Sequence, residues 1–346
     1  MLRVLTELNG VAGNEEKVAD FILSQVSVCA DEIIRDSMGN LIFLKKGKKP
    51  TSKKIAVFAH MDEVGLICTG ITDEGYIKFN EVGHIDDRVL LTQKVLVGDD
   101  EIEGVIGIKA VHLQGKEERK NIIKKEDMYI DIGAKSKEEA EKLVSKGDYI
   151  ALYSPYVRLY DRRFKAKAID DRIGCAIMME LMHEKYDCDI YFCFSVQEEM
   201  GMRGASVLTR RINPDVALVL EATTASDTAF VPEHLYCSRL GEGPVISLMD
   251  RGSYSDIELR RFIEEVADTK GIKYQYKRTG NGANDSRAVQ IGADGCRVAS
   301  ISLPCRYIHS AVSVADGGDC DEMKRLVRAV LNDIGNFFDD GSQEEE

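Results

Sequence analysis

The sequence contains no tryptophan, only six prolines, and no run of apolar residues long enough to cross a membrane. Its first ten residues show neither the apolar core nor the small-residue cleavage site of a secretory signal, so we expect no signal peptide. Nine cysteines are scattered along the chain without a Cys-x-x-Cys pair, which argues against a disulfide framework. These absences argue against a membrane protein or a disulfide-rich secreted protein, and they favour a reducing cytoplasm.

Concentrated positive charge is also absent. The formal net charge is -13, and the lysines and arginines are interleaved with acidic residues rather than gathered in a stripe. This distribution argues against a nucleic-acid partner. The hydrophobic content of 44% is ordinary for a globular protein, but 346 residues are too many for one ordinary core. We therefore expect two domains, or one domain with a large insertion.

Strand and helix patterns alternate before residue 70 and after residue 161. Apolar, β-branched runs predict strands, and apolar residues at helical spacing predict helices between them. Such alternation predicts an α/β fold with a mixed or largely parallel sheet that is covered by helices. The predicted strands include residues 32–35, 41–45, 54–60, 190–196, 216–220 and 297–302, and the predicted helices include residues 171–184, 204–210, 257–267 and 321–337.

Between residues 70 and 161 the pattern of apolar residues changes. Helical periodicity fades, and glycines separate short β-type runs at residues 76–79, 94–97, 105–108 and 128–131. That pattern is typical of a small β-barrel or sandwich-like unit. We therefore predict a discontinuous α/β domain, residues 1–69 and 162–346, that is interrupted by a β-rich insertion at residues 70–161.

The first candidate site residue, His60, ends a predicted buried strand. Asp62 lies two residues further along, and on an extended chain these two side chains face the same side. Asp62 could then accept the second ring N–H of His60 and fix the ring as a metal ligand. Taken alone, a His-x-Asp sequence at a strand end is more often structural.

Acidic residues follow other elements in the same way. Asp170 precedes a predicted helix, where it could bridge two cations, although helix capping is the favoured explanation for an isolated aspartate there. Glu198 and Glu199 follow a strand, and neighbouring side chains can join one site only where the chain turns. One glutamate could bind metal while the other moves a proton. The alternative is a turn with two solvated glutamates.

Two more candidates stand at strand ends. Glu221 ends a buried run, where an unpaired charge is costly, and His309 follows another buried strand. Strand carboxyl ends are where α/β sheets place their sites. Imidazoles and carboxylates together suit a pair of divalent cations, such as Zn, Co or Mn, that activate water for hydrolysis. The five candidate ligands are His60, Asp170, Glu199, Glu221 and His309.

The motifs around these residues resemble those of the glutamyl and deblocking aminopeptidases. This is a family of dinuclear metallopeptidases with tetrahedral, dodecameric members, some of which are named endoglucanase M. The resemblance covers nearly the whole chain, in order. The matching stretches are residues 59–65 (AHMDEVG), 167–174 (KAIDDRIG), 197–205 (QEEMGMRGA) and 306–310 (RYIHS).

The resemblance implies a zinc-exopeptidase-like catalytic domain with two metal sites. One metal would be held by His60, Asp170 and Glu221, and the other by Asp170, Glu199 and His309, so that Asp170 bridges the two. Many relatives carry aspartate where this chain has Glu221. The longer side chain supplies the same oxygen ligands, but it could change the spacing or the preference of the metals.

The resemblance also assigns the catalytic roles. Glu198 would be the general base that activates a bridging water and later protonates the leaving amine. Asp62 would orient His60. The peptide bond between Asp170 and Asp171 is expected to be cis.

The implied activity is removal of the N-terminal residue from short peptides, by a homo-oligomer that is a dodecamer or at least a dimer. Two other classes remain open. A metal-independent glycoside hydrolase would use paired carboxylates, but the chain has no tryptophan to stack on sugars. A non-catalytic peptide-binding or assembly protein would have no use for Glu198. Residues 282–285 could line a specificity pocket, although the start of a helix is the favoured interpretation.

Overall fold

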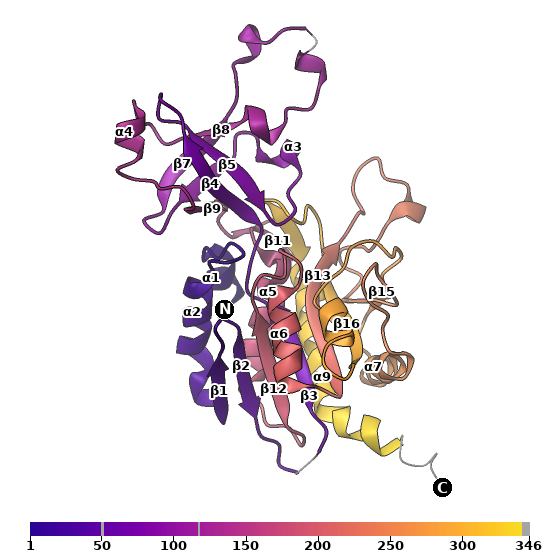
Figure 1. The fold of residues 1–346 in the computed structure, drawn as a ribbon. Helices are drawn as coiled ribbons and strands as arrows, with labels where there is room; N and C mark the ends of the chain where they lie inside the picture. The colour runs from indigo at the N-terminus through magenta and orange to yellow at the C-terminus, as the bar shows by residue number, and fades with distance from the viewer. Residues whose placement is uncertain (50–51, 117, 341–346) are drawn as a thin grey trace.

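The computed structural model describes residues 1–49, 52–116 and 118–340. It has two parts, a large sheet flanked by helices and a closed barrel that lies beyond one end of that sheet (Figure 1). None of the helices in the described ranges combines the length and the apolar character needed to span a membrane.

The large sheet has eight strands, and its centre is parallel. Strands β12, β3, β13 and β16 are adjacent and all run in the same direction. At the edges, β2 and β14 run antiparallel to their central neighbours, so the sheet is mixed with a parallel centre, as predicted. In spatial order the strands are β1 (Glu32–Arg35), β2 (Leu41–Lys45), β12 (Ile190–Ser195), β3 (Ile55–His60), β13 (Val216–Thr224), β16 (Arg297–Cys305), β14 (Val245–Ile246) and β15 (Gln275–Tyr276).

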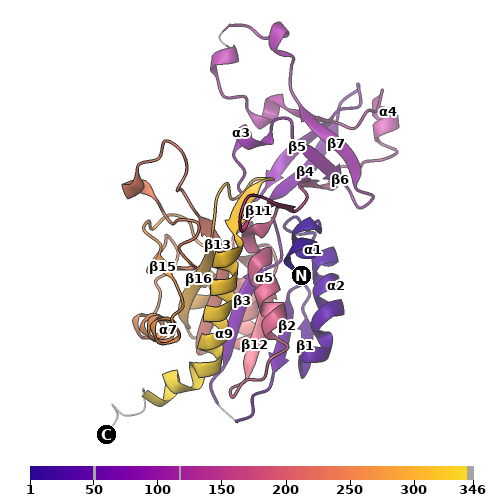
Figure 2. The same ribbon diagram turned by 180° about the vertical axis from the view of Figure 1, so that it is seen from behind.

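Helices cover both faces of this sheet. Alternate residues of β3 point to opposite faces, so that Val57 joins one buried cluster and Phe58 the other. A central strand that is buried on both faces needs apolar residues throughout, which is why β3 has a continuous apolar sequence. Figure 2 shows α5 and α9 on the first face. That face carries α1 (Leu2–Glu7), α2 (Glu16–Val26), α5 (Ile169–Leu181), α7 (Ile257–Lys270) and α9 (Gly317–Asp340), and the second carries α6 (Arg203–Ile212) and α8 (Ser286–Gln290).

The barrel has a hydrophobic core of its own. Two short helices, α3 (Asp87–Leu90) and α4 (Lys137–Ala140), lie in its connections. Closure of the barrel leaves no exposed sheet edge of the kind that would pair with other chains. Its strands, in order around the barrel, are β4 (Gly65–Ile71), β5 (Ile77–Val82), β8 (Tyr129–Asp131), β7 (Ile102–Gly107), β6 (Lys94–Val97) and β9 (Tyr149–Leu152).

A small sheet of three strands, β10 (Val157–Arg158), β11 (Arg163–Ala166) and β17 (Ser313–Asp316), also forms. The sequence patterns predicted neither this sheet nor the barrel strands β4 and β9. Strand β4 carries two glycines and a register shift between Cys68 and Gly70, which obscures the alternating pattern of a strand. Helix α9 starts at Gly317 rather than at the predicted residue 321, because its glycine-rich first turn lacks the usual helical signal.

Candidate metal centre

The sequence-predicted site residues meet at one edge of the sheet. His60 is the last residue of β3, and its strand partner on β12 is Ser195, just before the chain turns toward the two glutamates. Glu221 lies on β13, and His309 follows β16. Because these four strands are parallel neighbours, their carboxyl ends open on the same cavity, which has a volume of about 530 Å³. We call His60, Asp170, Glu198, Glu199, Glu221 and His309 the ligand wall.

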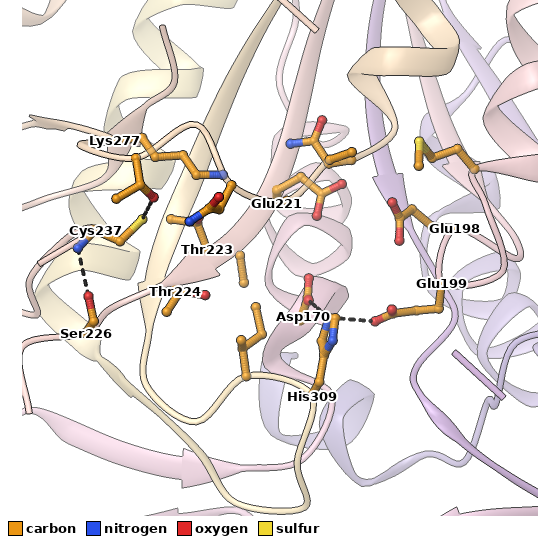
Figure 3. A pocket seen from close by; sticks show the side chains of 18 of the residues that line it. Asp170, Glu198, Glu199, Glu221, Thr223, Thr224, Ser226, Cys237, Lys277 and His309 are labelled. Atoms are coloured by element: carbon orange, nitrogen blue, oxygen red, sulfur yellow. Dashed lines mark hydrogen bonds and ion pairs between the residues drawn. The ribbon is translucent and has the colours of Figure 1, made fainter. Parts of the chain in front are cut away.

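Asp170 lies at the centre of the ligand wall, at the start of α5 (Figure 3). One of its carboxylate oxygens is 3.4 Å from Nε2 of His60, and the other is 3.4 Å from Nε2 of His309. Nε2 of His60 is also 3.7 Å from a Glu221 oxygen, and Nε2 of His309 is 3.5 Å from a Glu199 oxygen. The peptide bond that follows Asp170 is cis, as the resemblance implied. Two groups of three residues that could each hold a metal ion therefore share Asp170.

These distances suit two ions rather than hydrogen bonds. Hydrogen bonds between nitrogen and oxygen span about 2.7–3.2 Å. Two ligands held about 2.0–2.2 Å from one tetrahedral ion lie about 3.3–3.6 Å apart. In addition, Asp170 Oδ1 and Glu221 Oε1 are buried and accept no hydrogen bond from any residue that the structure describes. The residues present thus fit a divalent cation in each group.

Electrostatics also favour cation binding, because several carboxylates are buried together. Burial raises the pKa of Glu199 to about 7 and raises the pKa of Glu198 and of Glu221 well above the ordinary range. Burial also lowers the pKa of His309, but the carboxylates of Asp170 and Glu199 outweigh this effect and raise it to about 9. A cation relieves the repulsion among these carboxylates, which protonation would otherwise have to relieve.

Asp62 holds the turn that carries the two glutamates. Its two carboxylate oxygens accept hydrogen bonds from the backbone N–H groups of Glu198, at 2.9 Å, and Glu199, at 3.0 Å. Nδ1 of His60 lies 3.1 Å from the backbone carbonyl of Asp62 and 3.5 Å from its carboxylate. The side chain thus lies beside the ring, as expected, but its own hydrogen bonds go to the turn. Gln197 has φ of 55°, and this change in direction brings both glutamates toward His60.

A buried charge network supports the ligand wall from behind. The ammonium group of Lys167 donates to both carboxylate oxygens of Glu63, at 2.6 and 2.7 Å. Arg172 donates to the carbonyls of Met61, at 2.7 Å, and Leu5. The network joins the segment before Asp170 to the segment after His60, so it fixes the distance between two of the predicted ligands.

Comparison with known proteins decides the family. The model of the M42 glutamyl aminopeptidase family matches residues 39–326. The chain is 39% identical to an inferred aminopeptidase of Acetivibrio thermocellus, over 95% of this chain and 97% of that protein. It is 34% identical to the lysyl aminopeptidase of Pyrococcus furiosus, over 96% of each chain. The solved structure of the Pyrococcus horikoshii TET1 peptidase, described as able to assemble into a tetrahedron or a large octahedral shell, superposes with a TM-score of 0.85 at 32% identity, covering 95% of this chain and 98% of that chain.

The chain belongs to the M42 aminopeptidase family. It is therefore a metal-dependent aminopeptidase, a hydrolase that acts on peptide bonds. The family resemblance and the fold class that the sequence indicated are both confirmed.

One carboxylate of this M42 aminopeptidase is not recognisable from its sequence. The pattern around Asp285 favours the start of a helix, and α8 does begin at Ser286, but the Asp285 side chain forms no cap. It is fully buried and accepts a hydrogen bond from the Ser195 hydroxyl, while its other oxygen has no partner among the described residues. Burial raises the pKa of Asp285 to about 6. An aspartate before a helix looks the same in sequence whether it caps the helix or turns inward.

The side of the cavity opposite the ligand wall is made mostly by loops. Ser226 accepts a hydrogen bond from the backbone N–H of Cys237, at 2.8 Å, and the Thr279 hydroxyl donates to the Cys237 sulfur, at 3.2 Å. Residues 282–284 line the cavity too, which supports the alternative considered for that loop. We call Thr223, Thr224, Ser226, Cys237, Lys277 and Thr279 the far wall. Figure 3 labels all of these residues except Thr279.

Proposed function

We propose that the enzyme removes the N-terminal residue of short peptides with two divalent cations held by the ligand wall. One cation would be bound by His60, Asp170 and Glu221, and the other by Asp170, Glu199 and His309. The observation that carries this proposal is the position of Asp170, whose two oxygens each lie 3.4 Å from a different histidine. The mixed nitrogen and oxygen ligands suit Zn, Co or Mn.

Bound there, two cations would polarise the scissile carbonyl, lower the pKa of the attacking water and bind the free α-amine of the peptide. Glu198 would accept the proton of that water and return it to the leaving amine. Its place supports this role, because it lines the cavity within 4.8 Å of one ligand from each group, His60 and Glu199, while Asp62 holds its backbone.

Domain organisation and assembly belong to the same proposal. Residues 1–69 and 162–346 would form the catalytic unit, and residues 70–161 would form an insertion that serves in dimerisation. The barrel strands, which run from Gly65 to Leu152, support an insertion in this part of the chain, although the first of them begins before residue 70. Exposed apolar side chains on the insertion, among them Val111, Leu113 and Ile122, support an interface there. We further propose a dodecamer with a dimer as its unit, on the likeness to the TET1 peptidase. We also propose a place in a reducing cytoplasm, which the scattered cysteines without a Cys-x-x-Cys pair support.

Two neighbouring variants test the mechanism. Glu198→Gln keeps the shape of the side chain but cannot accept the proton, so turnover should be lost while two metals per subunit remain bound. Glu199→Gln should lose metal instead, because it weakens a ligand. Metal content by mass spectrometry and hydrolysis of leucine p-nitroanilide would be measured on both. Near-normal turnover in Glu198→Gln would show that the assigned base is wrong.

Chelation separates the rival functions. Removal of metal should abolish hydrolysis of aminoacyl p-nitroanilides, and Zn²⁺, Co²⁺ or Mn²⁺ should restore it. A glycoside hydrolase that works with paired carboxylates alone would keep its activity on cellulose oligomers after chelation. A non-catalytic protein would bind peptides without releasing products. Membership of the family does not determine which N-terminal residue is preferred. The family is named for glutamyl aminopeptidases, whereas the Pyrococcus furiosus relative is a lysyl aminopeptidase.

A further inference from the structure

We propose that Glu15 is a positioning residue for the general base, and that it acts through the backbone of Gln197. The inference rests on the proposed function, because Glu15 can serve this purpose only if Glu198 moves the proton. Glu15 lies directly before α2, far from the site in sequence, and its side chain is buried.

Strand β12 ends just before the two glutamates. Its last residue, Ser195, still pairs with β3. A strand that continued would point Glu198 and Glu199 to opposite faces of the sheet. The chain turns instead, and both carboxylates lie within 4.8 Å of a ring nitrogen of His60. The turn leaves the next backbone N–H groups without strand partners, and buried N–H groups need partners of another kind.

Side chains supply those partners. We call residues 196–199 the catalytic turn, and the backbone N–H groups of all four donate to side-chain oxygens. The acceptors are Asn40 for Val196, at 2.9 Å, Glu15 for Gln197, at 3.0 Å, and Asp62 for Glu198 and Glu199, at 2.9 and 3.0 Å. All three acceptor residues are buried and come from three different segments. The position of the catalytic turn therefore depends on these three side chains.

Among the three, Glu15 holds the residue with the least favourable backbone conformation. Gln197 has φ of 55°, and residues other than glycine keep such a conformation only where their surroundings hold it. The same Glu15 oxygen also accepts the N–H of Gly13, at 2.7 Å, so the carboxylate is fixed on its own side. Within the described ranges, the Glu15 side chain forms no hydrogen bond to the ligand wall side chains, so its loss should act on the catalytic turn alone.

A shift of the catalytic turn should affect Glu198 more than Glu199. Glu199 would be held by its cation as well as by its backbone, whereas the general base would have no such tether. A misplacement of about 1 Å can lower a rate by about a hundredfold. Loss of the Glu15 acceptor should therefore lower kcat while the metals stay bound.

Two variants of Glu15 separate the acceptor from the rest of the side chain. Glu15→Met keeps the length but offers no oxygen, so kcat of the metal-loaded enzyme for leucine p-nitroanilide should fall by about a hundredfold. KM and the content of two metals per subunit should stay at their wild-type values. Glu15→Gln keeps an oxygen at the same position, so its kcat should stay within a few-fold of wild type. Glu16→Met is the matched control, because Glu16 is adjacent but exposed, and its kcat should not change.

A second control tests whether destabilisation alone lowers kcat. Asp319 is another buried carboxylate that accepts two backbone N–H groups, those of Gly241, at 2.7 Å, and Gly243, at 2.8 Å. None of these three residues lines the cavity. Asp319→Leu should lower the free energy of unfolding in urea but leave kcat at its wild-type value.

Hydrogen exchange observes the catalytic turn without turnover. In Glu15→Met the N–H of Gln197 lacks its acceptor, so peptides that cover residues 196–199 should exchange faster in mass spectrometry. In Glu15→Gln they should exchange at the wild-type rate.

The outcomes that would overturn the inference are distinct. Absence of hydrolysis by the wild-type enzyme with any of the metals would overturn the proposed function as well. Wild-type kcat in Glu15→Met would overturn only the role of Glu15. A loss in Glu15→Gln as large as in Glu15→Met, or a similar loss in Asp319→Leu, would attribute the effect to destabilisation. Loss of metal from Glu15→Met would mean that Glu15 supports the ligands rather than the general base.

Discussion

The two walls of the cavity are built in different ways. The ligand wall lies at the ends of adjacent parallel strands, in the short turns that follow β12 and β16, and at the start of α5, so its residues lie close to one edge of the sheet. The far wall stands largely on loops whose side chains bond to one another, as Thr279 does to Cys237. The difference teaches that one fold can keep its catalytic chemistry while its substrate preference varies. Residues at strand ends are constrained by the packing of the sheet, whereas loop residues can change without disturbing it.

The strongest test of this contrast is Asp170→Asn. The change leaves one neutral oxygen where two charged oxygens faced two histidines, so both cations should be weakened. We expect kcat/KM to fall by about a thousandfold or more for every aminoacyl amide alike. Metal content by mass spectrometry should fall with it. A loss confined to one class of substrate would mean that the ligand wall also selects substrates, and the contrast would fail.

The buried ion pair between Lys167 and Glu63, behind the ligand wall, should contribute to the free energy of unfolding. Lys167→Met leaves Glu63 buried without its closest cation, and removing one partner of a buried pair typically costs about 3–5 kcal/mol. Denaturant unfolding would measure the loss. The double variant Lys167→Met with Glu63→Gln should recover part of it, since the uncompensated charge is gone. No recovery would mean that lost packing rather than charge causes the effect.

A pH-dependent test concerns Glu15, which accepts a hydrogen bond from the backbone N–H of Gln197, at 3.0 Å, beside the two glutamates of the ligand wall. Burial raises the pKa of Glu15 from 4.5 to about 7. Between these values the folded protein keeps a proton that the unfolded chain has lost. The stability contributed by Glu15 is therefore complete below pH 4.5 and is lost as pH rises through 7, by about 3 kcal/mol.

Glu15→Gln should lack this loss. The free energy of unfolding of the variant should therefore improve relative to wild type between pH 5 and pH 8, as measured in urea at several pH values. Glu16→Gln is the matched control, because Glu16 is adjacent but exposed, and its difference from wild type should stay flat. A flat difference for Glu15→Gln as well would contradict a buried, proton-binding carboxylate beside the ligand wall.

The smallest effect is expected at the far wall. Thr279→Val removes one hydrogen bond to a sulfur, so stability should change by about 1 kcal/mol or less. We expect KM values to shift a few-fold, by different factors for different first residues, with metal content unchanged. A fall in metal content in this variant would contradict the contrast, because it would show that metal binding at the ligand wall depends on the far wall.

The central strands of the sheet could be predicted from the sequence because each depends on a local pattern of apolar residues. Three of the four central strands contain a short apolar run followed by a polar residue, namely Ser195 in β12, His60 in β3 and Glu221 in β13. Parallel strands bring such ends to one edge of the sheet, so the candidates that follow strands could be grouped by position, whereas Asp170 stood before a helix and its bridging role came from the family resemblance. Strand β4 was not predicted, because its glycines and its register shift interrupt the alternating pattern of a strand.

Other features depend on packing between distant segments. Asp285 meets Ser195 across 90 residues of sequence, and nothing in the sequence around Asp285 shows that its side chain turns inward. Lys277 looks like any surface lysine until the loop with Gly282 is placed beside it.

The sequence by itself determined the order of the elements, the family and the kinds of side chain at the strand ends, because local periodicity and short motifs carry that information. Only the tertiary structure decided which Asp170 oxygen faces which histidine, and that Lys277 points into the cavity. Such relations depend on distances between segments far apart in the chain, and those distances are set by the packing of the sheet, the helices and the loops together.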